Sequence, residues 1–202
     1  MPSSSDIPVQ SATPLLAELR LATAAEHQAL EDRLDLFNRV RTLASYTALL
    51  ERFHRVVQPL EVLLESRVDW NATGWDFAAR LKTPWLVQDI QSLRGLAPVS
   101  HLAPPELPLI EGLGEGIGCL YVLEGSTLGG QGISRHFREL LKITPERGGA
   151  YFNAYGAETG RRWKEFCQWA ESAAVADPGM IEAACSSARQ TFAAFEQQLA
   201  VF

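Results

Sequence analysis

Apolar residues recur at three- and four-residue spacing along most of this 202-residue chain, which is the spacing of one face of an α-helix. No alternation of apolar and polar residues is long enough to predict a β-strand, and no segment repeats at a fixed period. We therefore predict an all-α fold. Hydrophobic residues make up 47% of the chain, enough to bury one core, so we expect a single helical domain over residues 14–202.

The apolar periodicity and the capping residues place the individual helices. The first is expected over residues 14–34, with Pro14 in its opening turn, and the second starts after Thr42 and is kinked at Pro59. Residues 69–74 are expected to form a turn, and residues 98–108 a Pro-rich link. Further helices are expected at residues 84–93, 109–141, 158–173 and 180–199.

Composition and charge argue against several classes of partner. The formal net charge of −6, without a basic run, argues against nucleic acid, and no apolar run reaches the roughly 18 to 20 residues of a membrane span. Residues 1–13 are rich in Ser and Pro and lack the features of a signal peptide, so we interpret them as a flexible N-terminal arm. Three cysteines without a CxxC pair predict reduced thiols and a cytoplasmic protein.

His27 is the best-placed candidate ligand among four histidines. It lies on the apolar face of the first predicted helix, and Glu31 follows one turn later, where it could orient the ring. Arg20, two turns earlier on nearly the same face, could bind a carboxylate. From the residues alone, an inward histidine is more often a hydrogen-bonded core residue than a ligand, and Arg20 could equally be solvated.

The other histidines carry weaker signals. Glu51 and His54 form one Glu-x-x-His element, which is half of what a di-iron site in a helix bundle uses, and no second copy exists. Packing explains His54 better than a metal site does. We expect His101 and His136 at the surface.

Glycines interrupt the predicted helix at 109–141, although each costs about 1 kcal/mol relative to alanine inside a helix. At their seven-, four- and three-residue steps the residues Gly118, Gly125, Gly129 and Gly132 share one face. Such a face permits either close helix packing or the approach of a flat ligand. The spacing is wrong for a dinucleotide-binding loop, and Ser126 does not stand in a GxSxG turn, so a hydrolase is disfavoured as well.

Two blocks together resemble the heme oxygenase family, in particular its bacterial branch. They are LRLATAAEH at residues 19–27, followed by Glu31, and YVLEGSTLGGQ at residues 121–131. The likeness extends in weaker form from about Leu16 to Leu199. It implies a helical fold that holds heme between a proximal helix and a kinked, glycine-rich distal helix, and cleavage of the macrocycle to biliverdin, iron and carbon monoxide.

The resemblance also implies roles for individual residues. His27 matches the proximal ligand of the heme iron, with Glu31 placed to bond its other ring nitrogen. On the distal helix, Gly125, Gly129 and Gly130 place backbone instead of side chains beside bound O₂. Ser126 stands where the animal enzymes carry an aspartate that anchors distal waters, which leaves the route of proton delivery and the cleaved carbon open.

Basic residues match the positions that face heme propionates in the family. These are Arg20 on the proximal helix and Lys164, with Arg161 or Arg162, on the later helix.

Electrons would come from a separate reductase or ferredoxin, because the chain carries no flavin or nicotinamide motif. The product could supply biliverdin to a bilin-binding photoreceptor, or the reaction could release iron from heme. A non-catalytic heme carrier or sensor is the first rival, although a carrier has no need for the glycine run. A thiaminase-like or di-iron protein of the wider fold group is the second.

Overall fold

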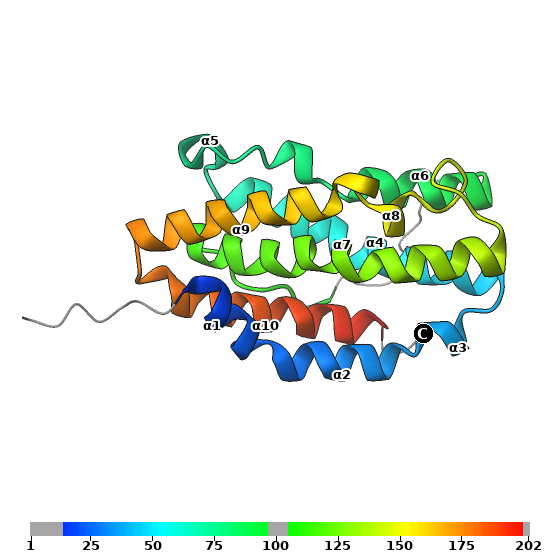
Figure 1. Cartoon of the computed structure of the whole chain (residues 1–202), viewed down its shortest axis with the longest axis horizontal. Coiled ribbons are helices and arrows are strands. Elements are labelled where there is room, and N and C mark those ends of the chain that lie inside the picture. The colour runs from blue at the N-terminus through cyan, green and yellow to red at the C-terminus, as the bar shows by residue number, and fades with distance from the viewer. Residues whose placement is uncertain (1–13, 97–104, 200–202) are drawn as a thin grey trace, which may run out of the picture.

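The computed structural model describes residues 14–96 and 105–199, which form helices joined by short loops (Figure 1). In chain order the elements are α1 (Leu15–Ala22), α2 (Ala24–Leu34), α3 (Leu36–Arg39), α4 (Leu43–Arg67), α5 (Trp70–Thr73), η1 (Ala78–Arg80), α6 (Thr83–Arg94), α7 (Leu113–Leu141), α8 (Ala150–Asn153), η2 (Gly156–Glu158), α9 (Thr159–Ala176) and α10 (Met180–Leu199). The described residues contain isolated bridges at Thr144 but no strand, so the all-α prediction is confirmed. The predicted arm at 1–13, residues 98–104 of the predicted link and His101 lie outside the described residues.

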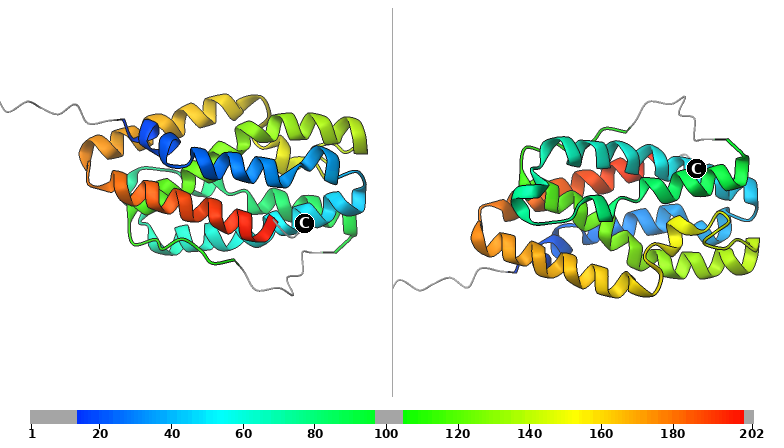
Figure 2. Two further views of the ribbon diagram at one scale, coloured as in Figure 1. Left: turned by 90° about the horizontal axis from the view of Figure 1, so that it is seen from below. Right: turned by 90° about the horizontal axis from the view of Figure 1, so that it is seen from above.

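The first predicted helix is divided in two at Thr23, so the expectation of one helix over residues 14–34 was wrong. Thr23 has φ −114° and ψ 3°, and its buried hydroxyl donates to the carbonyl oxygen of Leu19 at 2.8 Å. The same kind of bond occurs at Thr47 and Thr191 within unbroken helices, so the backbone angles of Thr23 mark the break and the bond alone does not explain it. The break leaves α2 as a separate helix that lies beside α10 (Figure 2).

The second helix begins as predicted. Thr42 is the N-cap of α4, since its side chain accepts a hydrogen bond from the Ser45 N–H while the Ser45 side chain binds the backbone of Thr42. The helix continues through Pro59 to Arg67. The turn expected at residues 69–74 contains the short helix α5, which ends at Gly74 in the left-handed region with φ 67°.

The glycine-rich segment forms one uninterrupted helix, α7, which packs most extensively against α10. A side chain at Gly118 would place its Cβ 2.0 Å from the carbonyl oxygen of Ala184 in α10. Glycine is therefore required at this crossing, because any side chain would push the two helices apart. At Gly118 the correct interpretation is close helix packing.

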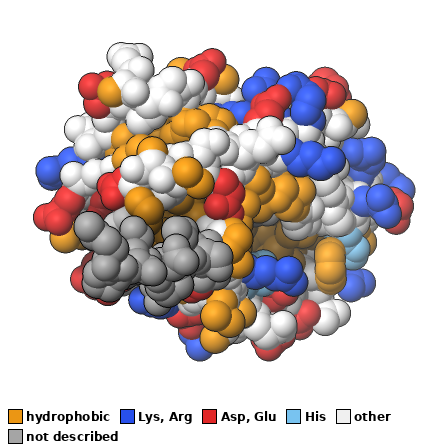
Figure 3. Space-filling view, turned by 60° about the vertical axis from the view of Figure 1, so that its left-hand side comes forward, with side chains coloured by type: hydrophobic (Ala, Val, Ile, Leu, Met, Phe, Trp, Pro, Cys, Tyr) orange, Lys and Arg blue, Asp and Glu red, His pale blue; other side chains and the backbone are white. Residues whose placement is uncertain are grey.

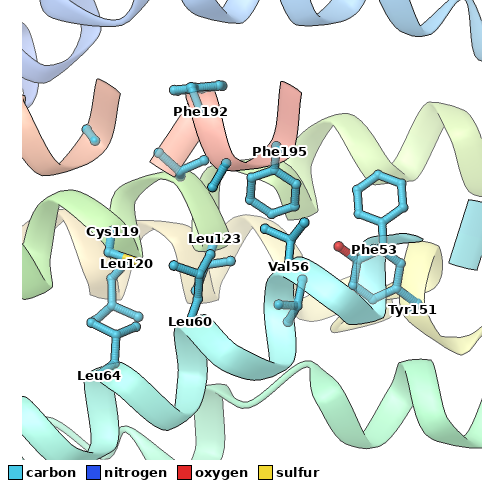
Figure 4. Close-up of a cluster of buried hydrophobic side chains, with 14 of the residues drawn as sticks. Phe53, Val56, Leu60, Leu64, Cys119, Leu120, Leu123, Tyr151, Phe192 and Phe195 are labelled. Carbon is cyan, nitrogen blue, oxygen red and sulfur yellow. The ribbon is translucent and has the colours of Figure 1, made fainter. Parts of the chain in front are cut away.

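A single hydrophobic core joins the long helices. Figure 4 shows side chains of α4, α7 and α10 meeting, among them Leu60, Leu123 and Phe195, with Tyr151 of α8 at one end. Residues from Leu15 to Leu199 belong to this core, so the described residues form one domain. Asp89 of α6 secures α8 by accepting the backbone N–H groups of Ala150 and Tyr151 at 2.9 and 2.8 Å.

The three cysteines are free thiols. Cys119 and Cys185 are buried and Cys167 is half-buried. Burial raises the pKa of Cys119 to about 12 and that of Cys167 to about 11, so both keep their protons at neutral pH.

Candidate functional site

A cavity of about 650 Å³ opens between the helices, a size typical of small-ligand pockets. Both α2 and α7 line it, and residues of α1, α3, α4, α6, α8, α9 and α10 complete it. On the face shown in Figure 3, hydrophobic side chains gather around a hollow with charged side chains at its rim. The aromatic lining residues are Phe53, Trp85, Tyr121, Tyr151, Phe152, Trp163, Phe192 and Phe195.

His27 of α2 faces this cavity. Its side chain is 58% exposed, so the ring is available to a ligand instead of being enclosed in the core. The ring meets Phe192 of α10 edge-on, with centroids 5.8 Å apart. Nδ1 lies 3.6 Å from Oε2 of Glu31, which also lines the cavity. The other ring nitrogen, Nε2, thus remains for a ligand.

The glycines of α7 form another wall of the cavity. Gly125, Ser126, Gly129 and Gly130 all line it. A Cβ at Gly129 would meet nothing within 4 Å, and one at Gly125 would only touch Trp163 at 3.8 Å. Backbone is therefore exposed where side chains would otherwise fill the cavity.

Two other glycines of α7 have different functions. A Cβ at Gly130 would lie 3.0 Å from the carbonyl oxygen of Phe152, so this position lets α8 approach α7. Gly132 is exposed and does not line the cavity. The shared face expected for Gly118, Gly125, Gly129 and Gly132 thus serves the ligand cavity only at its middle two positions.

The hydroxyl groups of Ser126 and Thr127 are bound within α7. Ser126 donates to the carbonyl oxygen of Leu123 at 2.9 Å, and Thr127 donates to that of Glu124 at 2.6 Å. Both residues line the cavity. Each hydroxyl oxygen can accept a hydrogen bond there, but its proton is already engaged.

Of the basic residues predicted at the site, Arg20 lines the cavity. Lys164 is exposed on α9 and does not line it. Arg161 pairs at the surface with Glu158 of η2 and with Glu165 of its own helix. The guanidinium of Arg162 lies 5.6 Å from the Tyr155 ring. The fold brings Arg20 together with His27 and leaves the α9 cations outside the lining.

The Glu-x-x-His element formed by Glu51 and His54 has a different environment from that of His27. Glu51 forms an ion pair with Arg94, and His54 is buried, with a pKa lowered by burial and by nearby Arg55. In the described part of the chain, no three His, Cys, Asp or Glu side chains are grouped so that they could hold a metal ion. The geometry gives no support to a di-iron centre.

The profile of the heme oxygenase family matches residues 13–200. The chain belongs to the heme oxygenase family. It is accordingly a heme-binding, heme-degrading enzyme.

Solved structures of heme oxygenases share the fold. The NO- and CO-bound heme oxygenase of Neisseria meningitidis superposes with a TM-score of 0.74 at 21% identity, covering 93% of this chain and 91% of that one. The heme oxygenase of Leptospira interrogans gives 0.74 at 17% identity, covering 94% and 100%. A search of curated proteins gave no match. None of the described helices is both long and apolar enough to cross a membrane.

The residues around the cavity fit heme. Porphyrin is flat and apolar, and the cavity offers aromatic walls, bare backbone at Gly125 and Gly129, and an imidazole that can bind iron. Sequence reasoning missed Lys82, whose buried side chain also lines the cavity. Because lysine is normally exposed, a lysine without a special motif is expected at the surface, and nothing near Lys82 in the sequence indicated its burial. Its partner Glu124, a carboxylate within an apolar run of α7, was the available signal.

Proposed function

We propose that this heme oxygenase binds heme with His27 on the iron and opens the macrocycle to biliverdin, iron and carbon monoxide. The observation that carries the proposal is the pairing of an accessible imidazole with a wall of bare backbone in one cavity. Heme supplies the oxygen chemistry when bound, and the protein supplies position and water control.

His27 and Glu31 act together in this proposal. Glu31 Oε2 lies 3.6 Å from Nδ1, so a hydrogen bond that formed between them on heme binding would present Nε2 to the iron and hold the ring in one orientation. The edge contact with Phe192 further restricts the ring. Heme binding would bury both residues and strengthen their interaction, because the local dielectric constant falls.

Gly125 and Gly129 would leave space for O₂ beside the macrocycle, and Gly130 would contribute backbone to the same wall while it admits α8. A side chain at Gly129 would project into that space, since nothing else occupies it. Ser126 contributes an acceptor for water through its hydroxyl oxygen, because its proton is bound to Leu123.

Arg20 is the proposed partner of a heme propionate, since it lines the cavity and carries a permanent charge. Lys164, with Arg161 or Arg162, would act from the surface of α9 as longer-range cationic partners.

Electrons would come from a separate reductase or ferredoxin. The proposed biological uses are biliverdin supply to a bilin-binding photoreceptor and iron release from heme.

Titration of the purified protein with hemin, followed by ascorbate in air with catalase present, tests the proposal. We expect a Soret band that saturates at one hemin per chain and then decays as the broad red absorption of biliverdin grows. Carbon monoxide in the headspace would complete the set of products. Binding with a persistent Soret band would contradict the proposed reaction, and absence of binding would contradict the proposed site.

A further inference from the structure

A buried charged cluster lies behind the glycine wall of α7. Lys82 Nζ donates to Oε1 of Glu124 at 2.7 Å, and Arg80 Nη1 lies 3.3 Å from Oε2 of the same carboxylate. Tyr155 donates its phenol proton to Oε1 at 2.9 Å. Burial and the charge of Glu124 raise the pKa of Tyr155, so the phenol stays protonated. Glu124 immediately precedes Gly125, so the cluster is fixed to the glycine wall.

Lys82 is the member of this cluster that reaches the cavity. Its side chain is 2% exposed, yet it is one of the cavity-lining residues. An ammonium group has three N–H donors. In the described part of the chain Nζ donates to two acceptors, Glu124 and the carbonyl oxygen of Arg80 at 2.9 Å. The third donor is available to a group inside the cavity.

The side chains at residues 125–130, the glycine-lined stretch of α7, leave no hydroxyl proton free for the cavity. The hydroxyl protons of Ser126 and Thr127 are engaged by backbone carbonyls of α7. A water or oxygen ligand beside this wall would therefore find hydrogen-bond acceptors on α7 and a charged donor in Lys82.

We propose that Lys82 is the hydrogen-bond donor of the glycine-lined side of the cavity, and that Glu124 is the positioning residue that holds its ammonium there. The inference rests on the proposed function, because it needs heme in this cavity with His27 on the iron. With heme bound, Lys82 would donate a hydrogen bond to a water held on the glycine-lined side of the cavity. Ser126 need not carry the charge that an aspartate would bring.

The charged and titratable groups around Lys82 set the sign of the expected effect. They are Arg80, Glu61, Glu124, Tyr155, Cys119 and, through Arg80, Glu165. A cation beside an iron-bound water favours the hydroxide form and lowers the pH at which the proton leaves. Removal of Lys82 should raise that pH, and removal of the Glu124 charge should lower it.

The test uses the ferric hemin complex of the full chain and follows its absorption spectrum against pH. For Lys82→Met we expect the midpoint of the transition from water to hydroxide to rise by about one pH unit. For Glu124→Gln we expect the same midpoint to fall. A residue that only stabilised the fold would not move the midpoint in opposite directions in these two variants. Arg67→Met is the matched control, because Arg67 is exposed and does not line the cavity.

A double variant, Lys82→Met with Glu124→Gln, covers the case in which the single lysine variant does not fold. It removes both charges together, and its midpoint should lie above that of Glu124→Gln alone. Unchanged midpoints, or equal shifts in both single variants, would overturn the role of Lys82 while the wild-type protein still bound and degraded hemin. Failure of the wild-type protein to bind hemin would overturn this inference together with the proposed function.

Discussion

The two main walls of the cavity, α2 and α7, are built on different principles. On α2 a single imidazole, His27, stands 58% exposed with Glu31 beside it. On α7 the cavity surface is backbone at Gly125 and Gly129, and the charged groups lie behind it around Glu124. The α2 wall extends the His27 side chain into the cavity, whereas the α7 wall has glycine at two positions where a side chain would occupy the cavity.

The difference suits two separate tasks in the proposed function: α2 would bind the heme iron, and α7 would leave room for the reacting ligand. A ligand for iron must reach into the cavity, so α2 tolerates an accessible polar residue on an otherwise sparsely buried helix. The α7 wall must leave room, and it obtains its polarity from residues on other elements. The glycines that lower its helix propensity are compensated by packing against α10.

The largest expected effect is on the α2 wall. His27→Ala should reduce bilin formation at least about 100-fold, because the iron loses its protein ligand. Added imidazole should restore part of the activity by occupying the vacated position. His136→Ala, which changes a histidine outside the cavity lining, is the control. Full activity in His27→Ala would contradict the assignment of α2 as the ligand wall.

The next effect concerns the part of α7 that meets α10. Gly118→Ala should lower the free energy of unfolding by about 3 kcal/mol, since its Cβ would lie 2.0 Å from the Ala184 carbonyl oxygen. Gly132→Ala, at an exposed position with open space, should instead raise it by up to about 1 kcal/mol. Urea unfolding measures both. A neutral Gly118→Ala would mean that the two helices can separate without cost.

A smaller effect is expected from a comparison of Gly129, which lines the cavity, with Gly132, which is exposed to solvent. Gly129→Leu should lower the rate of heme degradation about 10-fold or more, because the new side chain enters the cavity. Gly132→Leu should leave it nearly unchanged. Circular dichroism should show both variants fully helical. Equal rates in the two variants would refute the idea that α7 acts by withholding side chains.

The smallest effect concerns the rim. Arg20→Gln should weaken hemin binding about fivefold, and Lys164→Gln about twofold or less, since only Arg20 lines the cavity. Titration of the Soret band at low salt measures both affinities. A larger loss in Lys164→Gln would place the propionates nearer to α9 than to α1, which carries Arg20.

Much of the fold could be predicted from the apolar periodicity and the capping residues of the sequence. The long helices α4, α7, α9 and α10 follow from three- and four-residue spacing, and the start of α4 follows from the capping ability of Thr42. His27 was identified because its neighbours at helical spacing are apolar. These features depend on contacts within a few turns of chain, which the sequence displays directly.

Only the tertiary structure decided the rest. The different functions of Gly118 and Gly129 depend on what lies opposite each one: the backbone of α10 at Gly118 and open space at Gly129. Lys82 meets Glu124 across 42 positions of sequence, and its burial has no local signature. The sequence thus determined the helices and the iron-binding candidate, because those arise from short-range periodicity. The cavity wall and its buried charges were decided by long-range packing.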